Sequence, residues 1–378
     1  MSDKLHKDFI GTDLHSMFGA FVEKTSLGAQ QAATDGLVSI TGKFGIISIS
    51  ATGGTEVTVS SQRGIYSGYK YHTFTSGGNF VVTAGGYVQV LVVAGGGSGN
   101  TLGGGGSGGV VYHASKAVTA GTYSITIGAG GLFATGSGGG QDGGNSVFDD
   151  ITAVGGGHGQ YKNTGTDGGS GAGGSATADG LANPGAGTQA DSGGGTGYGE
   201  NGGTGWTSTN PAGGGGGGAS AVGGNADANA GGTGGAGINI ATIDATTYAG
   251  GGGGGGSASG GAGGAGGGGQ GGKTTDGVDC AANTGSGGGG TVDGKNGGDG
   301  GSGIVIIKYS TYTALTAESL EIYTDSAADP TTIRRKVVTS AASDTVNHGV
   351  LCPVKKGDYW KIVSTCTLGT CYWIPIGS

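Results

Sequence analysis

Short stretches in which apolar and polar residues alternate begin at about Phe44 and recur to the end of the chain. Period two, together with β-branched and aromatic residues, predicts β-strands, and glycine or serine-glycine pairs separate these stretches. The pairs Gly53-Gly54 and Gly77-Gly78 are compatible with tight hairpins. The first eight predicted strands are residues 47–50, 56–60, 69–74, 80–83, 87–94, 110–113, 123–127 and 304–309.

Residues 311–378 show the same strand pattern in an ordinary, less glycine-rich composition. They predict a small C-terminal β module. Together with the preceding strands, this module predicts an all-β chain built on an antiparallel scaffold. The strands predicted in the module are residues 320–323, 336–339, 359–363 and 371–375.

The N-terminal segment follows a different period. Apolar residues between Leu5 and Leu27 recur at a spacing close to 3.6, which predicts a short amphipathic helix in part of this segment. Its apolar stripe must be buried against another surface. That surface is either its own domain, or other copies of the chain or a larger assembly. We assign residues 1–43 to attachment or oligomerisation, with candidate contacts at Leu14, Met17, Phe18, Phe21 and Val22.

Most of the chain's 101 glycines lie in one block, residues 94–303. Strongly apolar strings flank it at residues 87–94 and 304–309, and these look able to pair as strands. A flexible linker would lie between domains, whereas this block lies between two strands of one folded unit. The predicted domains are therefore residues 1–43, residues 44–310 with the glycine-rich block as an insertion, and residues 311–378.

The glycine runs do not fit two familiar repeats. Collagen requires glycine at every third residue and abundant proline, but these runs are irregular and the chain has 5 prolines. The calcium-binding nonapeptide requires aspartate at a fixed offset, which is missing here. The remaining prediction is polyglycine II, in which threefold glycine helices lie side by side and exchange backbone hydrogen bonds. Some sub-stretches could also be flexible linkers.

Composition and charge limit the classes of partner that this chain can bind. The net charge of −8, without clusters of Lys or Arg, argues against nucleic-acid binding. No apolar run reaches the roughly 18 residues of a membrane span, and no signal-peptide core follows Met1. We therefore expect that the protein does not insert into a membrane. We also expect that it is synthesised in a cytoplasm. The 4 cysteines have no CxxC spacing, and we expect ordinary small apolar residues, with a Cys366–Cys371 contact across a hairpin left open.

Motifs for catalysis are weak. Residues 267–274 match the P-loop formula, but glycine and alanine precede them where a buried strand is required, and a turn-like stretch follows where a helix is required. The 6 histidines are dispersed, and a lone His72 or His113 on a strand is typical of a surface or hydrogen-bonded histidine. Asp149-Asp150 is typical of a turn. We expect no enzyme, no metal site and no cofactor.

Four segments together resemble the glycine-rich domain of bacteriophage fibre proteins: residues 71–74 (YHTF), 90–97 (VLVVAGGG), 127–131 (IGAGG) and 301–309 (GSGIVIIKY). The tail, residues 354–361 and 372–377, resembles the C-terminal β module of such fibres. The resemblance implies a non-enzymatic virion protein, a tail fibre or tip adhesin made in the host cytoplasm. It implies a homotrimer that joins other virion proteins through its N-terminus. The extra C-terminal module leaves open which end is distal.

Because glycine has no side chain, specific contacts must come from residues that interrupt the glycine runs. Aromatic rings there suit sugar rings or protein loops, so the expected ligand is a host surface glycan or an outer-membrane protein. The alternative is that these rings fill gaps between glycine helices. Rival functions are a structural virion component, such as a head fibre or adaptor, and an unrelated matrix or ice-binding protein. The candidate receptor-binding residues are His158, Tyr161, Lys162, Tyr198, Glu200 and Trp206, and the candidate oligomer contacts are Trp360, Tyr372 and Trp373.

Overall fold

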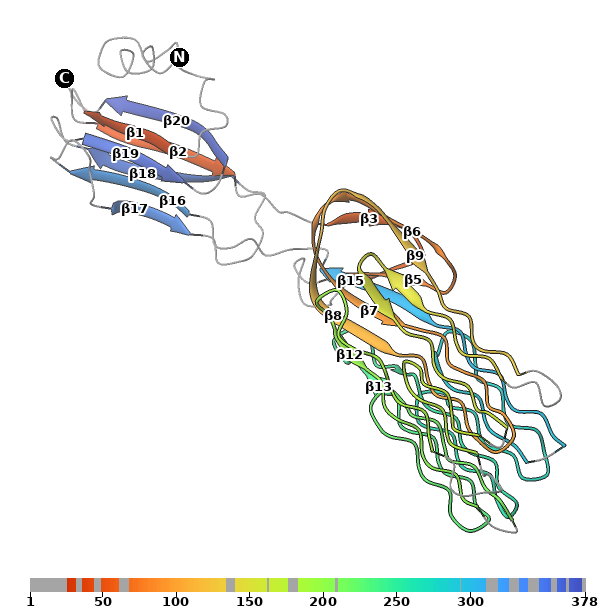
Figure 1. Cartoon of the computed structure of the whole chain (residues 1–378). Coiled ribbons are helices and arrows are strands. Elements are labelled where there is room, and N and C mark those ends of the chain that lie inside the picture. The colour runs from red at the N-terminus through yellow and green to blue at the C-terminus, as the bar shows by residue number, and fades with distance from the viewer. Residues whose placement is uncertain are drawn as a thin grey trace. The chain divides into compact units, whose positions relative to one another are not determined.

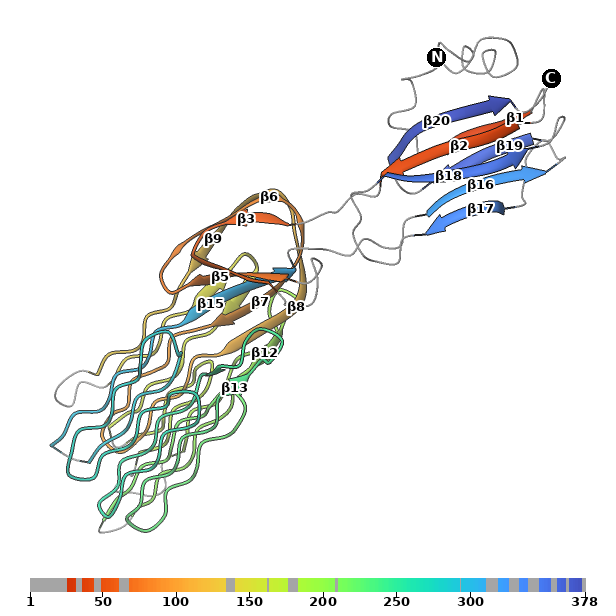
Figure 2. The ribbon, with the colours of Figure 1, turned by 180° about the vertical axis from the view of Figure 1, so that it is seen from behind.

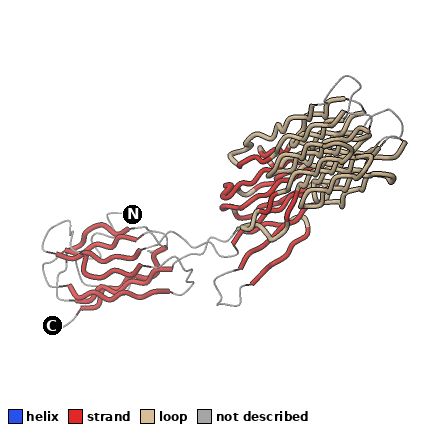
Figure 3. The backbone as a smooth tube through the Cα atoms, turned by 90° about the horizontal axis from the view of Figure 1, so that it is seen from below, coloured by secondary structure: helices blue, strands red, loops and turns tan. Residues whose placement is uncertain are grey.

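The structure is a computed structural model whose described residues form strands, turns and irregular segments, with no helix among them (Figure 3). Its strand pairs are antiparallel, so the all-β antiparallel prediction is confirmed. The predicted N-terminal helix and its stripe from Leu14 to Val22 lie outside the described residues. Those residues are 26–31, 36–43, 49–60, 68–133, 140–161, 163–175, 183–207, 210–292, 294–310, 319–325, 333–338, 347–354, 359–364 and 367–375.

The chain divides into two compact units. One combines Ile49–Val59 with Tyr69–Ser310, and is called here the glycine-rich unit. The other, the terminal unit, combines Met1–Ser48, Ser60–Gly68 and Thr311–Ser378. This division differs from the three predicted segments, because strands from residues 26–43 pair with strands from residues 347–375.

The terminal unit contains two antiparallel sheets. In the first, the order is β1-β19-β16-β17, and in the second it is β18-β2-β20, so that β2 lies between two C-terminal strands. The backbone register places Trp360 opposite Gln30, and Tyr372 and Trp373 opposite Ser39 and Val38. The strands are β1 (Ser26–Gln31), β2 (Gly36–Lys43), β16 (Ser319–Asp325), β17 (Ile333–Val338), β18 (Asn347–Val354), β19 (Tyr359–Ser364) and β20 (Thr367–Pro375).

One end of the glycine-rich unit consists of two sheets packed face to face, which Figures 1 and 2 show from opposite sides. The five-stranded sheet has the order β11-β10-β9-β6-β3 and the six-stranded sheet the order β12-β8-β7-β15-β5-β4. Phe80 and Phe148 of the first meet Val90, Val92 and Ile307 of the second in a shared core. The strands are β3 (Ser50–Thr52), β4 (Thr55–Ser60), β5 (Gly68–Phe74), β6 (Gly78–Ala84), β7 (Gly86–Val93), β8 (Val110–Val118), β9 (Gly121–Thr126), β10 (Ser146–Phe148), β11 (Ile151–Ala153), β12 (Thr196–Tyr198) and β15 (Ile304–Ser310).

The predicted hairpins at Gly53-Gly54 and Gly77-Gly78 are wrong. Each pair carries the chain from one sheet to the other, because β3 and β6 belong to the five-stranded sheet and β4 and β5 to the six-stranded one. Gly53 and Gly54 have φ of +123° and +63°, a conformation open to glycine but costly for other residues. A two-residue glycine corner can therefore serve a change of sheet as well as a hairpin.

The strands that flank the glycine block do pair. Ile304 of β15 lies opposite Val93 of β7, so the block starts and ends at neighbouring positions. A second apolar cluster covers the outer face of this sheet, and it includes Leu91, Ile306 and Ile243. The strands are thus buried on both faces, which explains their nearly continuous apolar sequence. Ile243 lies between the short strands β13 (Ile238–Asn239) and β14 (Thr247–Tyr248).

Glycine-rich segments leave the sandwich and run side by side to loops at the opposite end of this unit (Figures 1 and 2). Their hydrogen bonds have a period of three. In residues 94–100, every third amide donates to the same neighbouring segment at 2.9–3.1 Å, and the three classes of amide reach three different neighbours. Those neighbours are residues 103–109, 141–144 and 298–301.

The returning segment, residues 103–109, repeats this pattern. The amides of residues 104–109 donate in rotation to residues 214–217, 285–288 and 154–157, at 2.8–3.1 Å. Glycine is needed because the segments approach through their backbones. A Cβ added at Gly216, for example, would overlap the carbonyl oxygen of Gly105. The glycine block is therefore a lattice of backbone hydrogen bonds within one unit, and the word lattice is used below for these segments.

Candidate recognition surface

The loops at the end of the lattice opposite the sheets come from distant parts of the sequence. Residues 94–100 leave β7, turn at Thr101 and Leu102, and return to β8. Backbone bridges then join Thr101 to Thr291, Ala212 to Gly256 and Ala230 to Ser259. The described residues of these end loops are 101–102, 160–161, 163–164, 206–207, 210–211, 227–230, 257–258, 273–276, 292 and 294–296.

Trp206 lies in one of these end loops. Its amide donates to the carbonyl of Ala212 at 2.8 Å, and the amide of Ala212 returns the bond at 3.2 Å. Trp206 is 38% exposed, the lowest fraction among the exposed large hydrophobic residues in the described part of the chain. A well-held backbone that presents a partly exposed indole is suited to stacking on a ligand.

Tyr198 and Glu200 lie elsewhere. Tyr198 is the last residue of β12, opposite Val110, and packs against the apolar cluster on the outer face of the six-stranded sheet. Glu200 is half-buried, and its amide donates to Gly218 at 3.2 Å within the lattice. The structure thus separates these two residues from Trp206, and Tyr198 contributes to packing.

His158 belongs to a polar cluster at the start of another end loop. Its Nδ1 lies 2.6 Å from Oδ1 of Asp142, which also accepts the His158 amide at 3.0 Å. The Thr166 hydroxyl donates to the His158 carbonyl at 2.9 Å. Partial burial alone would raise the pKa of Asp142. The hydrogen bonds from His158 and its charge outweigh that effect, so the pKa is lowered. Half-buried Tyr161 follows three residues later, and Lys162 lies outside the described residues.

Side-chain oxygens of Asp and Asn recur where lattice segments end, a feature that the sequence analysis missed. Each accepts the backbone N–H of a neighbouring segment at 2.7–3.0 Å, and so satisfies an amide that would lack a lattice partner. The only sequence signal is an Asp or Asn beside a glycine run. The acceptors are Asp142, Asn145, Asp167, Asn201, Asn225, Asp276 and Asp279.

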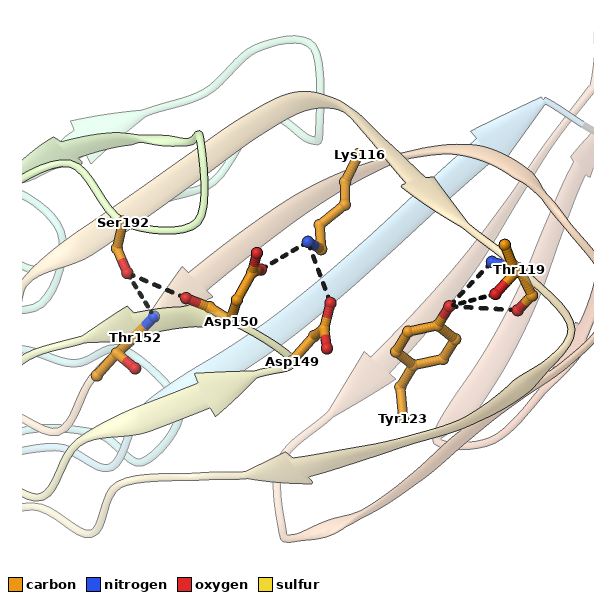
Figure 4. A network of polar contacts seen from close by, with 7 residues as sticks. All are labelled: Lys116, Thr119, Tyr123, Asp149, Asp150, Thr152 and Ser192. Carbon is orange, nitrogen blue, oxygen red and sulfur yellow. Dashed lines mark hydrogen bonds and ion pairs between the residues drawn. The ribbon is translucent and has the colours of Figure 1, made fainter.

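A second missed feature joins the two sheets. The ammonium of Lys116, in β8, lies 2.6 Å from Asp150 and 3.1 Å from Asp149, in the turn between β10 and β11 (Figure 4). Burial alone would lower the pKa of Lys116, but the hydrogen bonds to Asp150 and Asp149 outweigh that effect and raise it. Ser192 connects a third segment, since its hydroxyl accepts the Thr152 amide and donates to the Asp150 carbonyl. The prediction that Asp149-Asp150 forms a turn is confirmed.

His72 is a fully buried histidine with both nitrogens paired. The Gly53 carbonyl, 2.8 Å from Nδ1, can only accept, so Nδ1 carries the proton. The Tyr309 hydroxyl then donates to Nε2 at 3.1 Å. Burial lowers the pKa of His72 and raises that of Tyr309 to about 12. This is the hydrogen-bonded histidine that the sequence predicted.

The residues that match the P-loop formula belong to the lattice and do not form a phosphate-binding loop. Gly268, Gly269, Gly271 and Gly272 donate their amides to lattice carbonyls, so these donors do not point at a shared anion. Residues 274–292 after it are described and contain no helix. Within the described ranges, no group of three or more His, Cys, Asp or Glu side chains could hold a metal ion. Those ranges likewise contain no helix long and apolar enough to span a bilayer.

A β-sandwich extended by a glycine lattice defines the class of this chain. The model of a family described as a glycine-rich domain matches residues 73–310, from β5 through the whole lattice to the end of β15, and the chain belongs to this family. No curated protein matches the sequence.

Proposed function

We propose that this chain is a bacteriophage fibre or tip protein that attaches the virion to the host surface through its end loops, without catalysis. The observation that carries the proposal is the position of the non-glycine side chains that interrupt the glycine runs. A lattice of glycine offers almost no side chains, so the loops at its end are the places where specificity can reside. The resemblance of four segments to phage fibre domains supports the same function.

We infer further that the lattice is polyglycine II. A threefold helix directs successive N–H groups at intervals of about 120°, toward three neighbours in turn. The amides of residues 94–100 and 104–109 follow this rotation. Such a rod needs little apolar core, which suits a chain with 34% hydrophobic residues.

The proposed ligand is a surface glycan or an outer-membrane protein. Trp206 is the best-supported contact because its indole is exposed while its backbone is fixed. We propose that the N-terminal segment joins other virion proteins and that Trp360, Tyr372 and Trp373 contribute to a homotrimer. Deleting residues 1–25, which leaves β1 intact, should then remove the protein from particles, and Trp373→Ala should yield a folded monomer.

Replacing Trp206 by Ala tests the attachment function. The variant should lower the rate of adsorption at least tenfold and leave the unfolding temperature within about 2 °C, because the indole is exposed and its backbone bonds remain. Val222→Ala is the matched control, since Val222 is 55% exposed but lies beside a turn that packs on the outer sheet face. Adsorption should be unchanged in this control.

Other results would replace the proposal. Normal adsorption by Trp206→Ala particles, with the protein present on purified virions by mass spectrometry, would favour a head fibre or adaptor. A large loss of stability would make Trp206 a packing residue. Absence of the protein from virions would exclude any virion function.

A further inference from the structure

Strand β4 is an edge strand of the six-stranded sheet. Among the described strands, only β5 lies beside it, and residues 55–59 are all exposed. Val57 and Val59 are 50% and 49% exposed. Natural sheets protect such edges with lysine, proline, bulges or inward-pointing charges. Residues 55–60 read Thr-Glu-Val-Thr-Val-Ser, and their one charge, that of Glu56, is neutralised by Lys70 at 2.7 Å.

The contacts of Glu56 show which way the valines point. Glu56 bonds Lys70 at 2.7 Å and lies 3.8 Å from His72, whose ring packs inside the sandwich. Because side chains alternate along a strand, Val57 and Val59 face outward. Tyr69 lies on the same outer face, since the Lys308 ammonium, bonded to the outer Thr242 turn, lies over its ring at 4.4 Å.

These residues form an exposed apolar group at this edge of the sheet. Tyr69 is 44% exposed, and Tyr87, which lies outward two strands away on β7, is 65% exposed. Exposed apolar side chains gathered at an open strand edge are typical of an interaction surface.

We propose that β4 pairs antiparallel with β4 of a second copy of this chain, about a two-fold axis through Val57. This register joins the two six-stranded sheets and keeps their outer faces on the same side. Val57 then lies opposite Val57 of the second copy, and Val59 opposite Thr55, which are favourable β-branched pairs. The apolar groups around Tyr69 of the two copies then lie on the same side of the junction.

Charge favours a second copy as the occupant. The strand carries one charged residue, Glu56, and Lys70 already neutralises it at 2.7 Å. The register places Glu56 opposite Thr58 of the second copy, so that no like charges meet. A strand rich in basic residues would find no acidic edge here, because Lys70 neutralises Glu56. A second copy of β4 brings no like charges together and offers β-branched partners.

Disulfide trapping tests the axis directly. Directly opposite residues of an antiparallel pair have Cα atoms about 4.5–5.5 Å apart, within the span of a disulfide. Val57→Cys in the full chain should give a covalent dimer under mild oxidation. Wild type, with the same 4 native cysteines, and Val222→Cys, with similar exposure, should not.

Mass measurement tests the same contact without a cross-link. In Val57→Lys two ammonium groups would face each other across the axis, so its mass by light scattering should be about half that of wild type. Val222→Lys should keep the wild-type mass. Any trimer formed elsewhere would multiply all these masses alike, and adsorption plays no part in the result.

Two outcomes overturn the proposal. One is equal mass for Val57→Lys and wild type, together with no Val57→Cys dimer. The other is a Val57→Lys protein that loses stability at unchanged mass, which would mean that a segment of its own chain covers β4.

Discussion

Space determines where glycine is required. In the lattice a single methyl group would meet a backbone oxygen that cannot move aside, because that oxygen already accepts a hydrogen bond. Gly216 is such a position: its added Cβ would overlap the Gly105 carbonyl, which accepts the Gly252 amide at 2.9 Å. At Gly121, at the start of β9, the nearest atom to an added Cβ is 4.0 Å away.

Gly216→Ala should therefore lower the free energy of unfolding by about 1–3 kcal/mol, the usual effect of overpacking a rigid interior. Gly121→Ala should stay within about 0.5 kcal/mol of wild type. Chemical denaturation measures both. Equal stability of the two variants would contradict a close-packed lattice at Gly216.

His72 predicts a pH dependence. Its pKa is lowered by burial, so the unfolded chain binds the proton more readily than the folded one. Stability should therefore fall as pH drops below the unfolded pKa of about 6.5, by at most about 1.4 kcal/mol per pH unit. Denaturation of wild type between pH 7 and 5 should show this slope.

The control is His72→Gln, which removes the titrating group. Its starting stability should be lower, because Gln cannot reproduce both bonds, to Gly53 and to Tyr309. Its decline between pH 7 and 5 should be smaller than that of wild type. Identical slopes for the two proteins would show that His72 titrates alike in both states.

Single residues were harder to predict than their types. The sequence singled out Trp206 as a candidate contact or gap filler and His72 as a surface or hydrogen-bonded histidine, since each has a distinctive side chain. The Asp and Asn acceptors at segment ends were missed, because an acidic residue beside a glycine run is equally typical of a turn. Their partners, such as Asp279 for the Asp299 amide at 2.8 Å, depend on which segments are neighbours.

At the scale of elements, strong strands were predictable and connections were not. Residues 87–94 and 304–309 are rich in valine and isoleucine, and their pairing as β7 and β15 is confirmed. The corner at Gly53-Gly54 looked like a hairpin because local sequence specifies a sharp turn but not the sheet of the next strand. Strands β1 and β2 were missed, since their partners lie about 300 residues away in sequence.

The link between β8 and the β10–β11 turn predicts an asymmetry. Lys116→Met should cost only about 1 kcal/mol, because Asp149 and Asp150 remain 42% and 61% exposed to water. The double variant Asp149→Asn, Asp150→Ala should cost more, because it weakens the partners of a lysine that is 8% exposed. Urea denaturation compares them, and the reverse order would contradict the burial of this ammonium.

At the scale of the whole molecule, the glycine block could be placed inside a unit because both of its flanking strands were recognisable. The neighbours of each segment could not be predicted, since runs of glycine are interchangeable in sequence. Three-neighbour hydrogen bonding of this kind replaces the apolar core that ordinary domains need. It also concentrates side-chain chemistry in the end loops.

The central claim is that residues 155–300 form a hydrogen-bonded lattice in solution. Hydrogen–deuterium exchange of the full-length protein tests it most directly, with each rate compared with that of an unstructured chain of the same sequence. Amides of residues 213–218, 251–255 and 287–290, which donate to backbone carbonyls of other segments, should exchange at least about 100-fold more slowly than those of residues 227–230 and 273–276, because each opening breaks several bonds at once. Unprotected exchange throughout residues 155–300 would contradict the lattice and the recognition surface built on it.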